Sequence, residues 1–91
     1  MNEKCRGWVS NSAKKADEFY RAMADWIISR RPLAKVGELI KAGSAYRWAL
    51  SQAIKCLQSM KRTDQVTKKI EQTKEYEALV TAEIKALREL D

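Results

Sequence analysis

The sequence predicts an all-α fold, a small bundle of three long helices that forms a single domain over its 91 residues. Apolar residues recur every three or four positions along most of the chain, and no segment alternates apolar and polar residues as a β-strand would. Three glycines and one proline are few for this length, which favours long elements over a turn-rich fold. A chain this short can bury only a modest core.

The first helix is expected to begin near residues 10–12, where Ser10, Asn11 and Ser12 offer side-chain oxygens for an N-cap. Residues 1–9 would then form a leader that precedes the bundle. The helix should end around residues 29–31, because Pro32 disfavours helical geometry in the residue before it. Its expected apolar stripe, widened on one side by Phe19 and Trp26, consists of Ala13, Ala16, Tyr20, Met23 and Ile27.

The middle helix is predicted to be broken near Gly43. Pro32 suits the first position of a short helix, which Gly43 would close in the left-handed conformation, and Ser44 would cap the next helix. The alternative is one helix that continues through Gly43, since an interior glycine costs only about 1 kcal/mol. The expected buried side of the longer piece consists of Tyr46, Ala49, Leu50, Ala53, Ile54, Leu57 and Met60.

The last helix is predicted to run from about residue 64 to 90, with Thr63 as its cap. At this length it would measure roughly 40 Å, more than a globule about 25 Å across can cover. The sequence therefore predicts a protruding helical arm or a homodimer that sheathes it. The apolar stripe, with Tyr76 and Leu79 beside it, consists of Val66, Ile70, Thr73, Val80, Ile84 and Leu87.

Charge is unevenly distributed along the chain, whose formal net charge is +6. Residues 1–69 hold fifteen basic and six acidic residues, whereas residues 70–91 hold three basic and six acidic residues. Between Glu38 and Asp64 there is no acidic residue. This asymmetry predicts a macromolecular partner with an acidic surface, either a protein or a nucleic acid. The alternative is that Glu71, Glu75 and Glu83 of the last helix neutralise the cations within the bundle.

The candidate binding residues are the cations of this window and of the helix ends, together with two tryptophans, because tryptophan is frequent among binding hot spots. They are Trp8, Arg30, Arg31, Lys41, Arg47, Trp48, Lys55, Lys61, Arg62, Lys68 and Lys69. A turn at Gly43 would also outline a helix-turn-helix, in which Arg47, Gln52 and Lys55 would read DNA. Residues 44–62 further share the basic, amphipathic character of membrane-surface helices and calmodulin targets, although their alanine-rich side favours helix packing.

Catalysis and metal binding have little support in the sequence. Histidine is absent, which removes the usual zinc ligand sets and the commonest general base. We therefore predict no enzyme activity, no cofactor and no metal. Cys5 and Cys56 form no metal or redox motif, and residues 1–10 lack the apolar segment of a signal peptide. Free thiols in a reducing cytoplasm are therefore expected. No apolar run is long enough for a transmembrane segment.

The leading functional hypothesis is a non-enzymatic helical regulator or adaptor that docks on a macromolecular partner. In size and composition the chain resembles accessory proteins of phages and mobile elements that inhibit or redirect host machinery. One alternative is a nucleic-acid-binding protein that uses the basic surface of residues 30–69. A second alternative is a structural assembly subunit built on the last helix.

Overall fold

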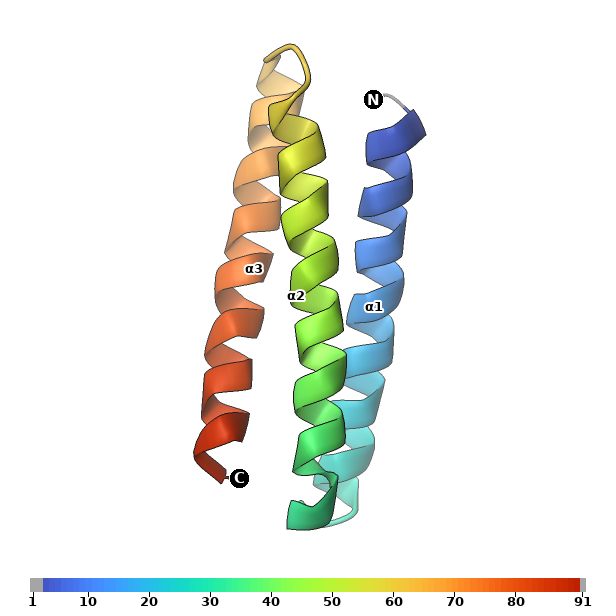
Figure 1. Ribbon diagram of the computed structural model, residues 1–91, viewed down its shortest axis with the longest axis vertical. Coiled ribbons are helices and arrows are strands. Elements are labelled where there is room, and N and C mark those ends of the chain that lie inside the picture. The colour runs from blue at the N-terminus through green and yellow to red at the C-terminus, as the bar shows by residue number, and fades with distance from the viewer. Residues whose placement is uncertain (1–2, 91) are drawn as a thin grey trace.

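Three antiparallel helices make up the computed structural model, which describes residues 3–90 (Figure 1). They are α1 (Glu3–Ile28), α2 (Val36–Gln58) and α3 (Asp64–Leu90), and a short 3-10 turn, η1 (Leu33–Lys35), precedes α2. The described residues contain no strand, so the predicted all-α bundle is confirmed. The bundle is elongated, with extents of 46 × 20 × 16 Å. The start of α1 and the α2–α3 connection lie at one end, and the α1–α2 turn lies at the other.

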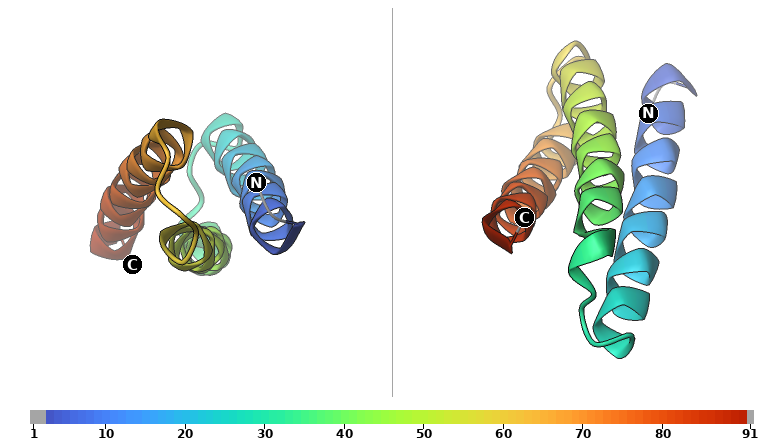
Figure 2. Two further views of the ribbon diagram at one scale, coloured as in Figure 1. Left: turned by 90° about the horizontal axis from the view of Figure 1, so that it is seen from above. Right: turned by 60° about the horizontal axis from the view of Figure 1, so that its bottom comes forward.

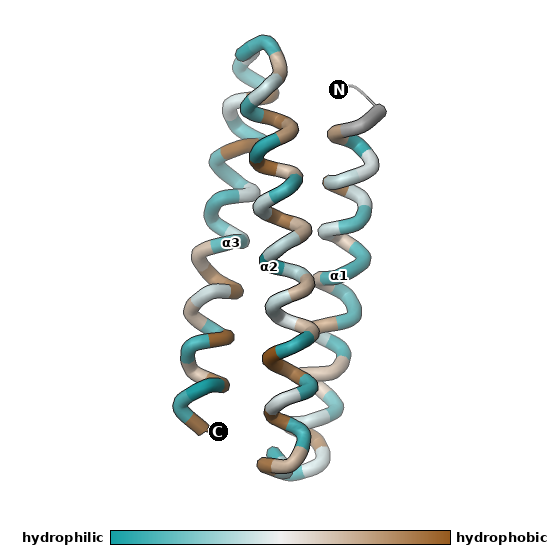
Figure 3. The backbone as a smooth tube through the Cα atoms, in the orientation of Figure 1, coloured by the Kyte–Doolittle hydropathy of each residue, from teal (hydrophilic) through white to brown (hydrophobic). Residues whose placement is uncertain are grey.

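Helix α2 is the centre of the bundle. Both α1 and α3 pack along it, and they hardly contact each other (Figure 2). Because it has neighbours on two sides, α2 is buried over a broad part of its circumference. Apolar segments accordingly recur along the whole of α2 (Figure 3). The predicted buried side of this helix is confirmed at Tyr46, Ala49, Leu50, Ala53, Ile54 and Leu57.

Helix α1 begins at Glu3, so residues 3–9 are its first turns rather than a leader. Ser12 does not cap the helix; its hydroxyl donates to the Val9 carbonyl at 2.7 Å, as serines inside helices often do. The buried residues of α1 recur every seven positions, at Cys5, Ser12, Phe19 and Trp26. The buried stripe of α1 is therefore rotated relative to the predicted one. Phe19 and Trp26 form the centre of the observed stripe, whereas Tyr20 and Ile27 lie at its exposed edge.

Helix α1 ends at Ile28, close to the predicted boundary, in a Schellman motif. The Arg31 N–H donates to the Trp26 carbonyl at 2.9 Å, and the Arg30 N–H donates to the Ile27 carbonyl at 3.1 Å. Arg30 (φ 66°) holds the left-handed position that glycine usually takes, and Arg31 (φ 54°) follows it. Pro32 precedes the 3-10 turn instead of opening α2.

The predicted break near Gly43 is wrong, because α2 continues from Val36 to Gln58. Gly43 has no left-handed backbone; it lies where all three helices meet. A Cβ atom at this position would lie 3.0 Å from Ile84 Cγ1 and 3.0 Å from Phe19 Cε1. The glycine therefore serves packing, and without a turn at Gly43 the helix-turn-helix hypothesis is wrong too.

Helix α3 has the predicted bounds and cap. The Val66 N–H donates to Thr63 Oγ1 at 3.2 Å, which satisfies one of the free amides at the helix start. Near the other end of α3, Leu87 belongs to the same apolar cluster as Val36 and Leu39 of α2. The predicted protruding arm is therefore wrong: the bundle is elongated rather than round, and α2 covers the apolar stripe of α3.

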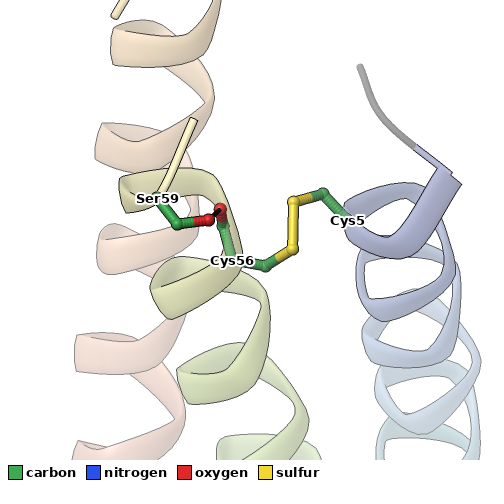
Figure 4. Close-up of a disulfide and its surroundings, with 3 residues drawn as sticks. All are labelled: Cys5, Cys56 and Ser59. Carbon is green, nitrogen blue, oxygen red and sulfur yellow. Dashed lines mark hydrogen bonds between the residues drawn. A yellow bond between two sulfur atoms is a disulfide. The ribbon is translucent and has the colours of Figure 1, made fainter. Parts of the chain in front are cut away.

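A disulfide joins Cys5 of α1 to Cys56 of α2, with the two Cα atoms 5.4 Å apart (Figure 4). The prediction of free thiols is wrong, because the α1–α2 hairpin brings residues 51 positions apart face to face. Cys5 is fully buried in a small apolar cluster with Leu57 and Ile70. The outer helix α1 is thus tied to α2 at both ends, by the turn at one and by the disulfide at the other.

Loss of the disulfide is expected to lower the free energy of unfolding by about 4 kcal/mol, because it closes a long loop in the unfolded chain. The measurement is chemical denaturation of the wild-type chain with and without reductant. The double variant Cys5→Ser/Cys56→Ser serves as the control, and reductant should not change its stability. Equal stability of the wild type in both conditions would contradict the bond.

Gly43→Ala is expected to lower the free energy of unfolding by about 1 kcal/mol, because crowding of Phe19 and Ile84 outweighs the gain in helix propensity. Gly37→Ala, in the same helix, is the matched control. Apart from Gly37 itself, its two chain neighbours and the adjoining backbone of its own helix, no atom lies within 4 Å of a Cβ at Gly37, so this variant should be stabilised by up to about 1 kcal/mol. Denaturation curves that shift in the same direction for both variants would rule out the close-packing role.

Candidate functional site

The candidate binding residues do not form a single patch. Arg30 and Arg31 lie in the α1–α2 turn, whereas Lys61 and Arg62 lie in the α2–α3 connection at the opposite end of the bundle (Figure 1). The helix that separates these two ends, α2, has 23 residues and is therefore roughly 35 Å long. A basic surface that spans residues 30–69 is therefore divided into separate regions.

One of these regions, which we call the basic face, is the exposed side of α2 that carries Lys41, Trp48 and Lys55. Successive members are seven residues, or about two turns, apart, so the three side chains lie on one line along the helix. Trp48 is 57% exposed, and the ring of Trp8 from α1 meets it edge-on with 5.4 Å between the ring centroids. Trp8 therefore extends this face across to α1.

Lys61 and Arg62 are both exposed in the connection that follows α2, and we count them with the basic face because they are the next cations in the chain after Lys55 and lie at the same end of the bundle. Arg47 lies apart from this line. It precedes Ser51 by one turn, and the Ser51 hydroxyl donates to Glu77 Oε2 of α3 at 2.6 Å. Arg47 is therefore exposed on the flank of α2 that adjoins α3.

The cations of the basic face have no ion-pair partner among the described residues. The two ion pairs found there both lie within α1, Lys15–Glu18 at 3.3 Å and Arg21–Asp17 at 3.0 Å. The acidic residues of α3 that bond to other helices do so with hydroxyl groups. Glu77 accepts from Ser51, and Glu83 Oε1 accepts from Tyr20 at 2.7 Å. Helix α3 therefore does not neutralise the basic face by ion pairing.

A second surface is an open groove between α1 and α3, which we call the α1–α3 groove. It has a volume of about 440 Å³, and its floor is formed by Tyr46 and Leu50 of α2. A neighbouring hollow of about 430 Å³ extends it toward the start of α3, and Lys69 lines both. The side chains that form the walls are Val9, Ser12, Ala13, Ala16 and Tyr20 of α1, and Lys69, Thr73, Tyr76 and Leu79 of α3.

Tyrosines close one end of this groove. Tyr20 packs edge-on against Tyr46, with ring centroids 6.0 Å apart, and its hydroxyl reaches across to Glu83. Burial and the hydrogen bond to Glu83 raise the pKa of Tyr20 well above its usual value. Burial, with the nearby Tyr76 and Glu83, also raises the pKa of Tyr46. Both phenols stay protonated at neutral pH; Tyr20 packs and donates a hydrogen bond, and Tyr46 packs against both Tyr20 and Phe19.

No constellation for catalysis or metal binding is found in the part of the chain that the structure describes. It contains no group of three or more His, Cys, Asp or Glu residues that could hold a metal ion. Every buried side-chain nitrogen or oxygen there has a hydrogen-bond partner, so no buried polar atom is left to bind a ligand. None of the described helices combines the length and apolar character needed to cross a membrane.

Comparison of the chain with family models, with curated proteins and with solved structures gave no match. Function must therefore be argued from the residues themselves.

The sequence analysis did not predict the α1–α3 groove. Two of the binding residues that it did predict, Lys68 and Lys69, line the extended groove. The available signal was an excess of apolar residues at the stripe edges. Tyr20 of α1, and Tyr76 and Leu79 of α3, lie beside their stripes and remain 37%, 44% and 56% exposed. What the sequence did not reveal is that α1 and α3 stay apart.

Arg30→Gly is expected to raise the free energy of unfolding by about 1 kcal/mol, because a left-handed backbone is costly for residues other than glycine. Arg30→Ala removes the same charge but keeps a Cβ atom, so it should give no such gain. Thermal and chemical denaturation of the two variants check this expectation. Equal stabilisation by Ala and Gly would attribute the effect to charge and contradict the backbone explanation.

Proposed function

We propose that this chain is a non-enzymatic docking protein, a regulator or adaptor that binds the acidic surface of a partner protein through its basic face. The observation that supports this proposal is the absence of ion-pair partners for Lys41, Lys55 and Arg62 among the described residues. Exposed cations without internal partners attract an anionic surface and accelerate its association. Neutralisation within the bundle, the competing interpretation, lacks the ion pairs it requires.

The tryptophan pair supports a protein partner in particular. Trp48 is more than half exposed, yet the Trp8 ring supports it from the side. A large ring held in place loses little conformational entropy on binding and can fill a pocket on a partner surface. Lysines two turns away on either side would add charge complementarity around this anchor.

Nucleic-acid binding is the second candidate, and one observation favours it. Lys61 and Arg62 of the connection and Lys68 and Lys69 of the second turn of α3 lie within nine positions of one another at one end of the bundle. Such a cluster could contact phosphates without reading bases. Arg30 and Arg31 lie at the other end, so the contact area would be smaller than residues 30–69 imply.

Two other expectations lose their basis. The apolar stripe of α3, which would have driven homodimer formation or assembly of a structural subunit, is buried against α2 at Ile70, Val80 and Ile84. The cytoplasmic location, with free thiols, was expected because the sequence shows neither a signal-peptide pattern nor a transmembrane segment. The disulfide favours an oxidising compartment instead.

The test is a charge reversal on the basic face, Lys41→Glu/Lys55→Glu/Arg62→Glu. The matched control, Lys74→Glu/Lys85→Glu/Arg88→Glu, reverses three exposed cations of α3 and lowers the net charge equally. The probes are fluorescently labelled polyglutamate and a mixed-sequence DNA duplex, followed by fluorescence anisotropy at several salt concentrations. The basic-face variant should lose at least about tenfold in affinity for polyglutamate, and the control much less.

Equal losses of affinity for polyglutamate in the two variants would show that binding depends only on net charge. That result would contradict a specific role for the basic face. Preferential binding of the duplex, with a steep loss of affinity as salt rises, would establish the nucleic-acid alternative instead. Far-ultraviolet circular dichroism of each variant separates loss of binding from loss of the fold.

A further inference from the structure

We infer that the α1–α3 groove is a docking site for an amphipathic helix of a partner protein, with acidic residues at one end of that helix. The groove lies apart from the basic face and shares no residue with it, so this inference does not depend on the proposed function. Its apolar surface is accessible: Tyr20, Tyr76 and Leu79 all line it, and all are exposed.

The groove walls require an occupant that satisfies its own backbone hydrogen bonds. Both walls and the floor are helices, whose interior N–H and C=O groups are already paired. An extended peptide would find no backbone partner there and would leave its amides unpaired against an apolar surface, which is costly. A helix bonds all of its interior amides internally, so it can bury one face in the groove without this cost.

The dimensions of the groove suit a helix of about three turns. Along α1 the wall extends from Val9 to Tyr20, a rise of roughly 16 Å. Ala13 and Ala16 form the middle of this wall, and their small side chains allow close approach of another helix. Since α1 and α3 hardly contact each other, a helix placed between them would complete a four-helix arrangement.

Charge indicates which helix would bind. Lys68 and Lys69 lie at the open end of the groove, and neither forms an ion pair with a described residue. The Lys69 ammonium group donates only to the side-chain oxygen of Gln72, at 3.3 Å. Aspartate or glutamate on the incoming helix would pair with these lysines, whereas a basic helix would be repelled.

A second copy of this chain is a poor occupant by the same criteria. The central apolar stripe of each of its helices is already buried within its own bundle, at residues such as Phe19, Leu50 and Val80. Its net charge of +6 would also oppose approach to Lys68 and Lys69. The occupant is therefore a helix of another protein.

The experiment uses a labelled synthetic peptide of leucine, alanine and glutamate whose leucines lie on one helical face, and a control peptide of scrambled sequence. Fluorescence anisotropy should show saturable binding of the helical peptide to the wild-type chain and much weaker binding of the scrambled one, which keeps the charge but has no apolar face. Ala13→Trp, which fills the groove, should weaken binding at least about tenfold. Ala78→Trp is the matched control, since Ala78 is exposed on α3 and lines none of these hollows, and it should bind like wild type.

Lys68→Glu/Lys69→Glu should also weaken binding of the acidic peptide, and a lysine-for-glutamate peptide should restore it. Absence of saturable binding to the wild type, or equal binding of the scrambled peptide, would overturn the inference. So would a wild-type dimer in sedimentation equilibrium that Ala13→Trp dissociates, because the groove would then hold a second copy. The basic-face variant Lys41→Glu/Lys55→Glu/Arg62→Glu should bind the helical peptide no more weakly than the α3 charge-reversal control does. The two proposals can therefore fail independently.

Discussion

The two outer helices of this bundle bury their apolar residues against the same central helix, and the rest of the structure depends on this arrangement. Because α1 and α3 hardly contact each other, most of what stabilises each of them comes from α2. Helix α2 must therefore present apolar residues toward both, and its buried residues occupy a wider arc than a single stripe. A fully buried side chain such as Leu50 or Leu57 contributes on the order of 2 kcal/mol, so substitutions in α2 would loosen both interfaces.

The outer helices are attached to α2 in different ways. Small residues on the α1 side of α2, Ala49 and Ala53, allow close approach but bury little area, and the Cys5–Cys56 bond adds a covalent tie. Helix α3 has no such bond; larger side chains and the Ser51–Glu77 hydrogen bond hold it. Across the gap, Tyr20 donates to Glu83, which sets the spacing of α1 and α3 at that end of the groove. The groove thus results from how the bundle is held together.

Local rules predicted the fold well where a single helix determined the outcome. Periodicity placed the buried residues of α2 and α3, and the Thr63 cap placed the start of α3. Prediction was wrong where the decisive contact came from elsewhere. Gly43 looks like a helix end in the sequence, but Phe19 and Ile84 explain it. The disulfide likewise depends on the register of the hairpin, which the spacing of Cys5 and Cys56 does not reveal.

The candidate surfaces follow the same division. The basic face was predictable, because seven-residue spacing along one exposed helix line is a property of α2 alone. The α1–α3 groove could not be predicted in this way. It exists only because α1 and α3, which are distant in sequence, stay apart in the bundle. Tyr46 forms the floor of the groove and Trp48 lies on the basic face, two residues or roughly 200° further around α2. The two surfaces therefore face in nearly opposite directions, so a partner on one leaves the other free. A chain that docks an acidic surface on one side of α2 and an acidic helix on the other would hold two proteins together, which is the geometry that an adaptor requires.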